Sequence, residues 1–105
     1  MQEATRDGLP LAAIEKINSI FQQYPQINKV VLYGLRALGN YRNGSDIDLC
    51  IDSNSLNLTE LFSIETQIDD LLLPWKIDLS LKNSIDNEAL LEHILTHGLV
   101  FFPHS

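Results

Sequence analysis

The sequence predicts an α+β (mixed α/β) protein, in which helices pack on one small mixed β-sheet. Two observations indicate this class. Segments rich in β-branched residues, or alternating between apolar and polar residues, occur at 29–33, 46–52, 76–81 and 99–102. Segments with helical spacing occupy much of the remaining chain. The 105 residues suffice for a single domain, 1–105.

Three helices are expected from apolar residues spaced three and four apart. The first follows Pro10 and ends before Pro25, and the second begins at a capping pair, Asn57 and Glu60. The third is capped by Asp86 or Asn87 and ends before Gly98. The residues expected to face inward are Ile14, Ile17, Phe21 and Tyr24, then Leu61, Ile64, Ile68 and Leu72, then Leu90, Leu91, Ile94 and Leu95.

The strands at 46–52 and 76–81 each have one acidic face. Asp46 and Asp48 stand two residues apart, so their side chains point to the same face, while the intervening isoleucine points to the core. Asp78 lies opposite the apolar residues of its own strand and could complete the cluster if the two strands are neighbours. Grouped carboxylates repel one another and favour Mg²⁺ with phosphate oxygens. Two such ions about 4 Å apart can hold the reacting oxygens in phosphoryl transfer.

A glycine directly follows the strand at 29–33. Gly34 would let the backbone approach a ligand closely, and a helical turn after it would present free N–H groups to a phosphate. Arg36 could add a bidentate contact. A phosphate-binding turn followed by a carboxylate strand favours a nucleotide site, although a lone pair of aspartates is more often only a solvated face.

The charge balance restricts the partners. The net charge is −7 and the isoelectric point about 4.6, which argues against an extended nucleic-acid surface and suits a basic protein partner. No apolar run reaches the roughly 20 residues of a membrane span, and we recognise no signal peptide. The single cysteine excludes an internal disulfide. We therefore expect a cytoplasmic protein without membrane contact.

Several other residues do not favour a site. His93 and His97 lie four apart, but the segment lacks the glutamate of a zinc-protease motif. His97 suits the end of a helix. Cys50 falls on the carboxylate face and is expected to be a small packed residue rather than a nucleophile. Tyr41 lies in a loop and could stack on a base, although an exposed loop tyrosine is the simpler expectation.

At the turn and the acidic strand, the chain resembles the minimal nucleotidyltransferases of the DNA polymerase beta-like superfamily. Their signature is Gly-Ser, ten residues, then Asp-x-Asp, with a later acidic residue. Here Gly34-Leu35 precedes Asp46-Ile47-Asp48 at that spacing, and LPWKIDL at 73–79 resembles the third-carboxylate strand. The likeness covers about residues 10–102 and implies the palm-like nucleotidyltransferase fold of polymerase beta.

The resemblance also implies roles. Asp46, Asp48 and Asp78 would be the catalytic residues and would bind Mg²⁺, two ions in all, while Gly34, Leu35 and Arg36 would hold the triphosphate of ATP. Small members of this kind often act as antitoxins. They pair with an all-helical HEPN ribonuclease toxin and transfer AMP from ATP to a toxin tyrosine. By analogy, Asp78 would deprotonate the acceptor hydroxyl.

Leu35 departs from the family pattern, because it stands at the position of the serine. Leucine keeps the backbone N–H but donates no side-chain hydrogen bond to a phosphate. Two functions are therefore kept: an active adenylyltransferase, and an antitoxin with a weakened site that neutralises its toxin by binding. A third, transfer to a small molecule, would need an acceptor pocket supplied by a partner or a homodimer.

Overall fold

The computed structural model describes residues 5–6, 8–42 and 44–103. Its centre is a four-stranded sheet of β3 (Ile27–Tyr33), β4 (Ile47–Ser53), β5 (Ile77–Leu81) and β6 (Leu99–Phe102), in the order β5-β4-β3-β6. β3 runs antiparallel to β4 and β6, whereas β4 and β5 are parallel. The sheet is therefore mixed, and the predicted α+β class is confirmed.

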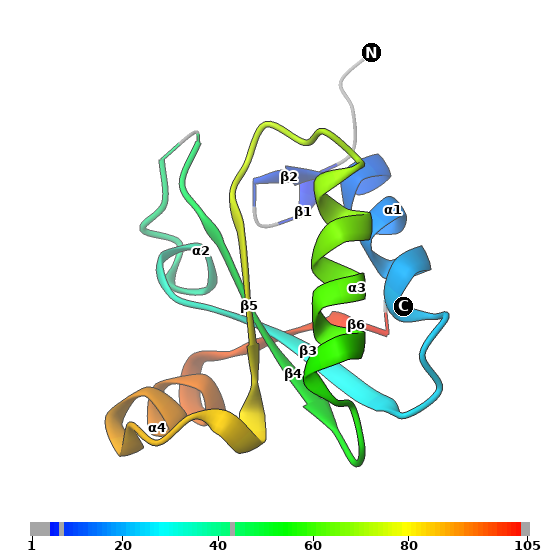
Figure 1. Cartoon of the computed structure of the whole chain (residues 1–105). Helices are drawn as coiled ribbons and strands as arrows, with labels where there is room; N and C mark the ends of the chain where they lie inside the picture. The colour runs from blue at the N-terminus through cyan, green and yellow to red at the C-terminus, as the bar shows by residue number, and fades with distance from the viewer. Residues whose placement is uncertain (1–4, 7, 43, 104–105) are drawn as a thin grey trace.

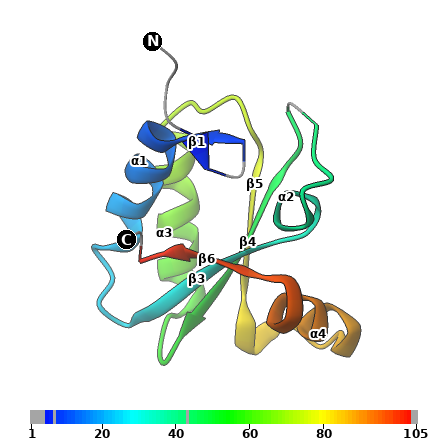
Figure 2. The same ribbon diagram turned by 180° about the vertical axis from the view of Figure 1, so that it is seen from behind.

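Two helices cover one face of the sheet. α1 (Leu11–Phe21) and α3 (Leu58–Asp69) lie side by side on it, as Figures 1 and 2 show from opposite directions. The predicted capping pair opens α3: Glu60 N–H donates to Asn57 Oδ1 over 2.8 Å, and Asn57 N–H donates to Glu60 Oε1 over 3.1 Å. The main core lies between these helices and the sheet, and it includes the apolar residues of β4.

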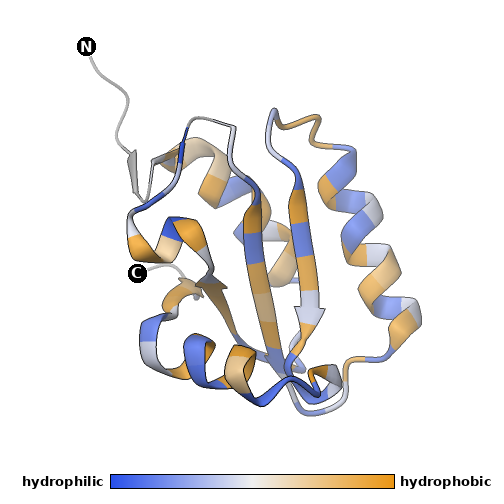
Figure 3. Ribbon diagram, turned by 90° about the vertical axis from the view of Figure 1, so that its left-hand side faces the viewer, coloured by the Kyte–Doolittle hydropathy of each residue, from blue (hydrophilic) through white to orange (hydrophobic). Residues whose placement is uncertain are grey.

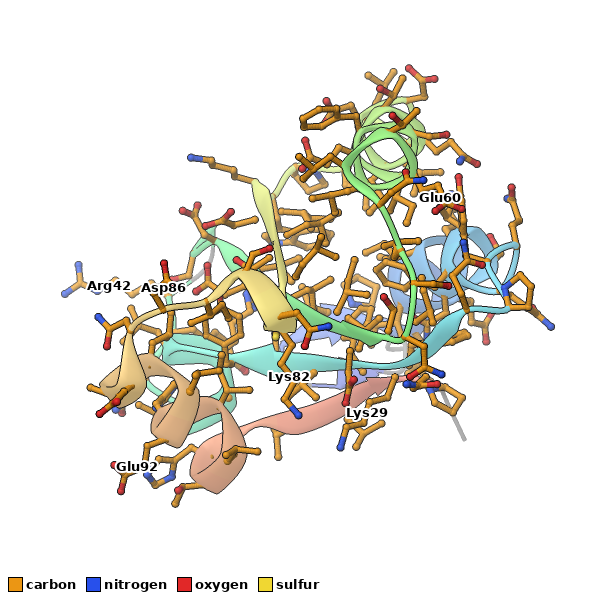
Figure 4. The ribbon with its side chains drawn as sticks, turned by 60° about the horizontal axis from the view of Figure 1, so that its bottom comes forward. Lys29, Arg42, Glu60, Lys82, Asp86 and Glu92 are labelled. Carbon is orange, nitrogen blue, oxygen red and sulfur yellow. The ribbon has the colours of Figure 1, made fainter. Side chains whose placement is uncertain are left out.

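The other face of the sheet is only partly covered. α4 (Glu88–His97), which follows a short 3₁₀ turn, η1 (Lys82–Ser84), packs on it through Ile94. Val31, Tyr33 and Cys50 form a second, smaller core with Ile94. The alternation of apolar and polar residues along β4 and β5 is visible in Figure 3. Lys29 of β3 and Lys82 of η1 project on the side of the sheet away from α1 and α3 (Figure 4).

Two expected core residues are exposed. Leu72 is 88% exposed and lies beyond the end of α3 with φ 54°, so the prediction that it faces inward is wrong. The prediction for Leu95 is also wrong, because α4 uses the face of Ile94 against the sheet and leaves Leu95 72% exposed. Leu95 does lie in α4, as its spacing predicted, whereas Leu72 lies outside α3. Helical spacing does not fix where a helix ends or how wide its covered face is.

A short hairpin at the N-terminal end was not predicted. β1 (Thr5–Arg6) pairs with β2 (Leu9–Pro10), and Gly8 between them has φ 76°. Leu9 is buried in the main core. No helix in the described part of the chain is long and apolar enough to cross a bilayer.

Candidate nucleotide-binding and catalytic site

The parallel pairing of β4 with β5 brings two of the predicted carboxylates together. Asp48 and Asp78 are register partners, and Tyr33 on β3 is the partner of Asp48 on its other side. Alternation places these three side chains on the face away from the main core. Asp46 lies directly before β4. β4 and β5 are therefore neighbours, which is the condition under which Asp78 was expected to join the carboxylates of the other strand.

The electrostatics indicate that these carboxylates crowd one another. Burial raises the pKa of the Asp48 carboxyl above its ordinary value, and the charges of Asp78 and Asp46 raise it further. Lys76, just before β5, lowers it. A cation bound between the carboxylates would relieve this repulsion. The carboxylate oxygens thus fit Mg²⁺ as a donor set.

The site is not a complete metal cage by itself. Within residues 5–6, 8–42 and 44–103, no three His, Cys, Asp or Glu side chains are grouped closely enough to hold a metal ion. Magnesium commonly takes only one or two carboxylates from a protein and its other oxygens from water and substrate phosphates. An open arrangement of carboxylates is therefore compatible with a metal that arrives with a nucleotide.

Gly34 lies against Asp48. A short helix, α2 (Leu35–Leu38), begins directly after Gly34, whose backbone has φ 78° and ψ −152°, a conformation that is essentially restricted to glycine. A β-carbon at this position would lie only 2.5 Å from Asp48 Oδ2. The missing side chain thus leaves the backbone of the turn open toward the carboxylate, as the prediction for Gly34 requires.

The Arg36 side chain is buried and forms hydrogen bonds within the protein. It is only 2% exposed, and its Nε and Nη2 donate to the carbonyl oxygen of Ser45 over 3.3 and 3.0 Å. Its guanidinium also lies 4.8 Å from the centre of the Tyr41 ring. Arg36 therefore connects α2 to the loop that leads into Asp46. A phosphate contact through Arg36 remains a prediction, and stacking of Tyr41 on a base does too.

The outer surface of α2 is apolar. Leu35 is 56% exposed and Leu38 is 43% exposed, three residues apart on one short helix. Neither side chain can hydrogen-bond a phosphate, but the backbone N–H groups of the turn are still present. At the predicted phosphate site the chain thus offers backbone donors and two leucines.

Tyr33 was not predicted to be part of the site. Its hydroxyl lies 3.4 Å from Ser80 Oγ on β5, so its ring spans the open face beside the carboxylates. Burial raises the pKa of the phenol, the hydrogen bond with Ser80 lowers it, and the charges of Asp48 and Asp78 raise it. The phenol therefore stays protonated and can donate. The alternation of β3, with Tyr33 two residues after Val31, was a usable signal for this placement.

His93 was predicted only as a helix residue, but it contacts the turn. Gly34 N–H donates to His93 Nε2 over 2.9 Å. The His93 and His97 rings lie 5.5 Å apart. Nothing in the spacing of the sequence pointed to the contact with Gly34. Cys50 falls on the predicted face and is 1% exposed, and burial raises the pKa of its thiol, which agrees with a packed cysteine.

Comparison with known proteins assigns the family. The family model described as polymerase beta nucleotidyltransferase matches residues 15–105. A putative protein adenylyltransferase of Methanocaldococcus jannaschii is 32% identical over 75 residues, which are 70% of this chain and 76% of the relative. The chain therefore belongs to the polymerase beta nucleotidyltransferase family, and it is of the nucleotidyltransferase class of enzymes.

Solved structures show the same fold. A toxin–antitoxin complex with AMP-PNP matches with a TM-score of 0.68 and 19% identity, over 88% of this chain and 74% of the other. A complex of a tri-AMPylated Shewanella oneidensis HEPN toxin with MNT antitoxin matches with a TM-score of 0.64 and 17% identity, over 88% of this chain and 71% of the other. The predicted nucleotidyltransferase fold is confirmed.

Proposed function

We propose that this protein transfers AMP from ATP to a hydroxyl group of a partner protein, with two Mg²⁺ ions that would share the carboxylates of Asp46, Asp48 and Asp78 and take their other oxygens from water and the nucleotide. The observation that carries the proposal is the register of Asp48 with Asp78, beside the open backbone of Gly34. Carboxylates and a phosphate-binding turn at one site suit a nucleoside triphosphate with its metal. The relative named as a protein adenylyltransferase supports AMP transfer to a protein.

In this proposal the turn at Gly34 and Leu35 holds the triphosphate through the backbone N–H groups that follow Gly34, whose own N–H is bonded to His93, and Arg36 keeps the turn in place. Mg²⁺ would neutralise charge on the phosphates when bound. Asp78, on the edge strand, accepts the proton of the attacking hydroxyl. The α-phosphorus then gains a bond to that oxygen and loses its bond to pyrophosphate.

The proposed partner is a HEPN-type toxin. A neighbour of the same fold is an MNT antitoxin in complex with an AMPylated HEPN toxin. The net charge of −7 would favour encounter with a basic partner. Modification of the toxin by this chain would then neutralise it in the cytoplasm, where ATP is available.

A second function is favoured by Leu35 and Leu38. Their exposure gives α2 an apolar surface where the family's serine would contact phosphate. The chain would then neutralise its toxin by forming a complex, with little or no AMP transfer. Asp48→Asn separates the two functions, because loss of neutralisation with retained binding supports transfer, whereas full neutralisation by the variant supports the complex.

Label transfer tests the chemistry directly. The purified protein is incubated with Mg²⁺ and a lysate of its source, with ATP labelled at either the α- or the γ-phosphate. AMP transfer predicts a protein band labelled only from the α position and lost with Asp48→Asn. A band labelled from the γ position, or one that persists in the variant, would contradict the proposal.

A further inference from the structure

The backbone of Gly34 is bonded to helix α4. Its N–H donates to His93 Nε2 over 2.9 Å, between residues 59 positions apart. Because a backbone amide can only donate, this nitrogen carries no proton, so a neutral imidazole acts as the acceptor. The same glycine faces Asp48 Oδ2 on the side where a β-carbon would be. Gly34 therefore lies between α4 and the carboxylates.

The hydrogen bond completes the end of β3. On the side of β6, the last register pair is Leu32 with Leu99, so the pairing of β3 with β6 ends before Gly34. A partly buried backbone N–H left without a partner would be costly. His93 satisfies this N–H at the point where the chain leaves the sheet.

The position of His93 is itself fixed by packing. Its neighbour Ile94 is 5% exposed and lies in the second core with Val31. At the end of α4, a β-carbon on Gly98 would collide with the Ile94 carbonyl and with Val31 Cγ1, so the helix approaches β3 very closely. The Tyr33 ring meets His93 edge-on, with centroids 6.3 Å apart. α4 thus presents the imidazole to Gly34 in one orientation.

We propose that His93 is a positioning residue for nucleotide binding: through its hydrogen bond to Gly34, α4 holds the turn in the conformation that receives the triphosphate. This role rests on the proposed function of the turn. It differs from simple helix packing, which would need the bulk of His93 but not a hydrogen-bond acceptor at Nε2.

Three variants separate these roles. His93→Ala removes the acceptor, whereas His93→Gln restores one through its side-chain carbonyl. His97→Ala is the matched control, because it removes an imidazole from the same helix that contacts the His93 ring but not Gly34. Thermal unfolding of each variant shows whether the fold is retained.

The first measurement is hydrogen exchange of the Gly34 amide by NMR, without nucleotide. We expect exchange roughly three- to tenfold faster in His93→Ala, the effect of one neutral hydrogen bond. His93→Gln should return the exchange rate of the Gly34 amide toward the wild-type value, and His97→Ala should leave this rate unchanged. Amides in the middle of β3 serve as the internal reference. Equal exchange in the wild type and His93→Ala would overturn the proposal.

The second measurement is the affinity for AMP-PNP with Mg²⁺. His93→Ala should bind roughly three- to tenfold more weakly, with recovery in His93→Gln and no change in His97→Ala. Wild-type affinity in His93→Ala, or equal weakening in the alanine and glutamine variants, would overturn the proposal. If the wild-type protein does not bind the nucleotide, the proposed function fails, and the role of His93 in nucleotide binding fails with it. The exchange data then still report whether His93 orders the turn.

Discussion

Gly34, directly after β3, lies in contact with Asp48 of β4, and there is no room for a β-carbon between them. A methyl group at position 34 would lie 2.5 Å from Asp48 Oδ2, and the backbone there has φ 78° and ψ −152°. The contact joins the turn proposed to hold phosphate to the carboxylate proposed to hold metal.

Gly34→Ala should lower the free energy of unfolding by about 1–3 kcal/mol through backbone strain alone. The methyl group would also displace the Asp48 side chain, which should lower the free energy of unfolding further. Gly39→Ala is the matched control. Gly39 also has a positive φ, 79°, but a β-carbon there would meet nothing within 4 Å. Chemical denaturation should rank Gly34→Ala as the more damaging change, and only Gly34→Ala should also weaken nucleotide binding. Equal effects would contradict the contact.

Asp48→Asn should stabilise the metal-free protein at pH 7. An aspartate whose pKa is raised by folding binds its proton more tightly in the folded state, so stability falls as the pH rises through the interval above the ordinary value of 3.8. The variant should therefore melt higher than the wild type in EDTA at pH 7, and the difference should disappear near pH 4.

Mg²⁺ should reverse this order, because it stabilises the wild type by binding the carboxylates and has less effect on Asp48→Asn. Asp52→Asn serves as the control, since the Asp52 carboxylate lies 3.6 Å from Lys82 Nζ and gains nothing from neutralisation. A wild type that melts above Asp48→Asn without metal at pH 7 would count against mutual repulsion of the carboxylates.

Leu35→Ser should strengthen binding of AMP-PNP with Mg²⁺ about tenfold or more, the effect of one hydrogen bond to a charged group. Leu35 is 56% exposed, so the change should leave the melting temperature nearly unaltered. Leu38→Ser removes a leucine of similar exposure from the same helix and should bind like the wild type. Unchanged affinity in Leu35→Ser would show that residue 35 does not face the phosphates.

Arg36→Lys should destabilise the fold by about 1–3 kcal/mol, because a lysine keeps the charge but cannot reproduce two buried guanidinium bonds to Ser45. Arg42→Lys is the control, since Arg42 is exposed. Denaturation curves should separate the two variants. Similar stability of both would argue against Arg36 as the connection between α2 and the loop before Asp46.

The main helices and strands and the three candidate carboxylates could be predicted from the sequence, because alternation and helical spacing are local properties. The contacts that depend on tertiary structure could not be predicted in this way. His93 reaches Gly34 only because α4 packs against β3, and no spacing of residues encodes that approach. Arg36 was predicted to bind phosphate because it lies two residues after Gly34 in the sequence. Its burial depends instead on the loop before β4, where the carbonyl oxygen of Ser45 accepts a hydrogen bond from the guanidinium.

The most direct test of the proposed transfer is the intact mass of the HEPN-type protein of the same organism. It is incubated with this protein, ATP and Mg²⁺, and compared with reactions that contain Asp48→Asn or EDTA. We expect a mass increase of one or more adenylyl groups with the wild type only. An unmodified HEPN protein that is nevertheless fully neutralised by both the wild type and Asp48→Asn would contradict AMP transfer and leave complex formation as the function.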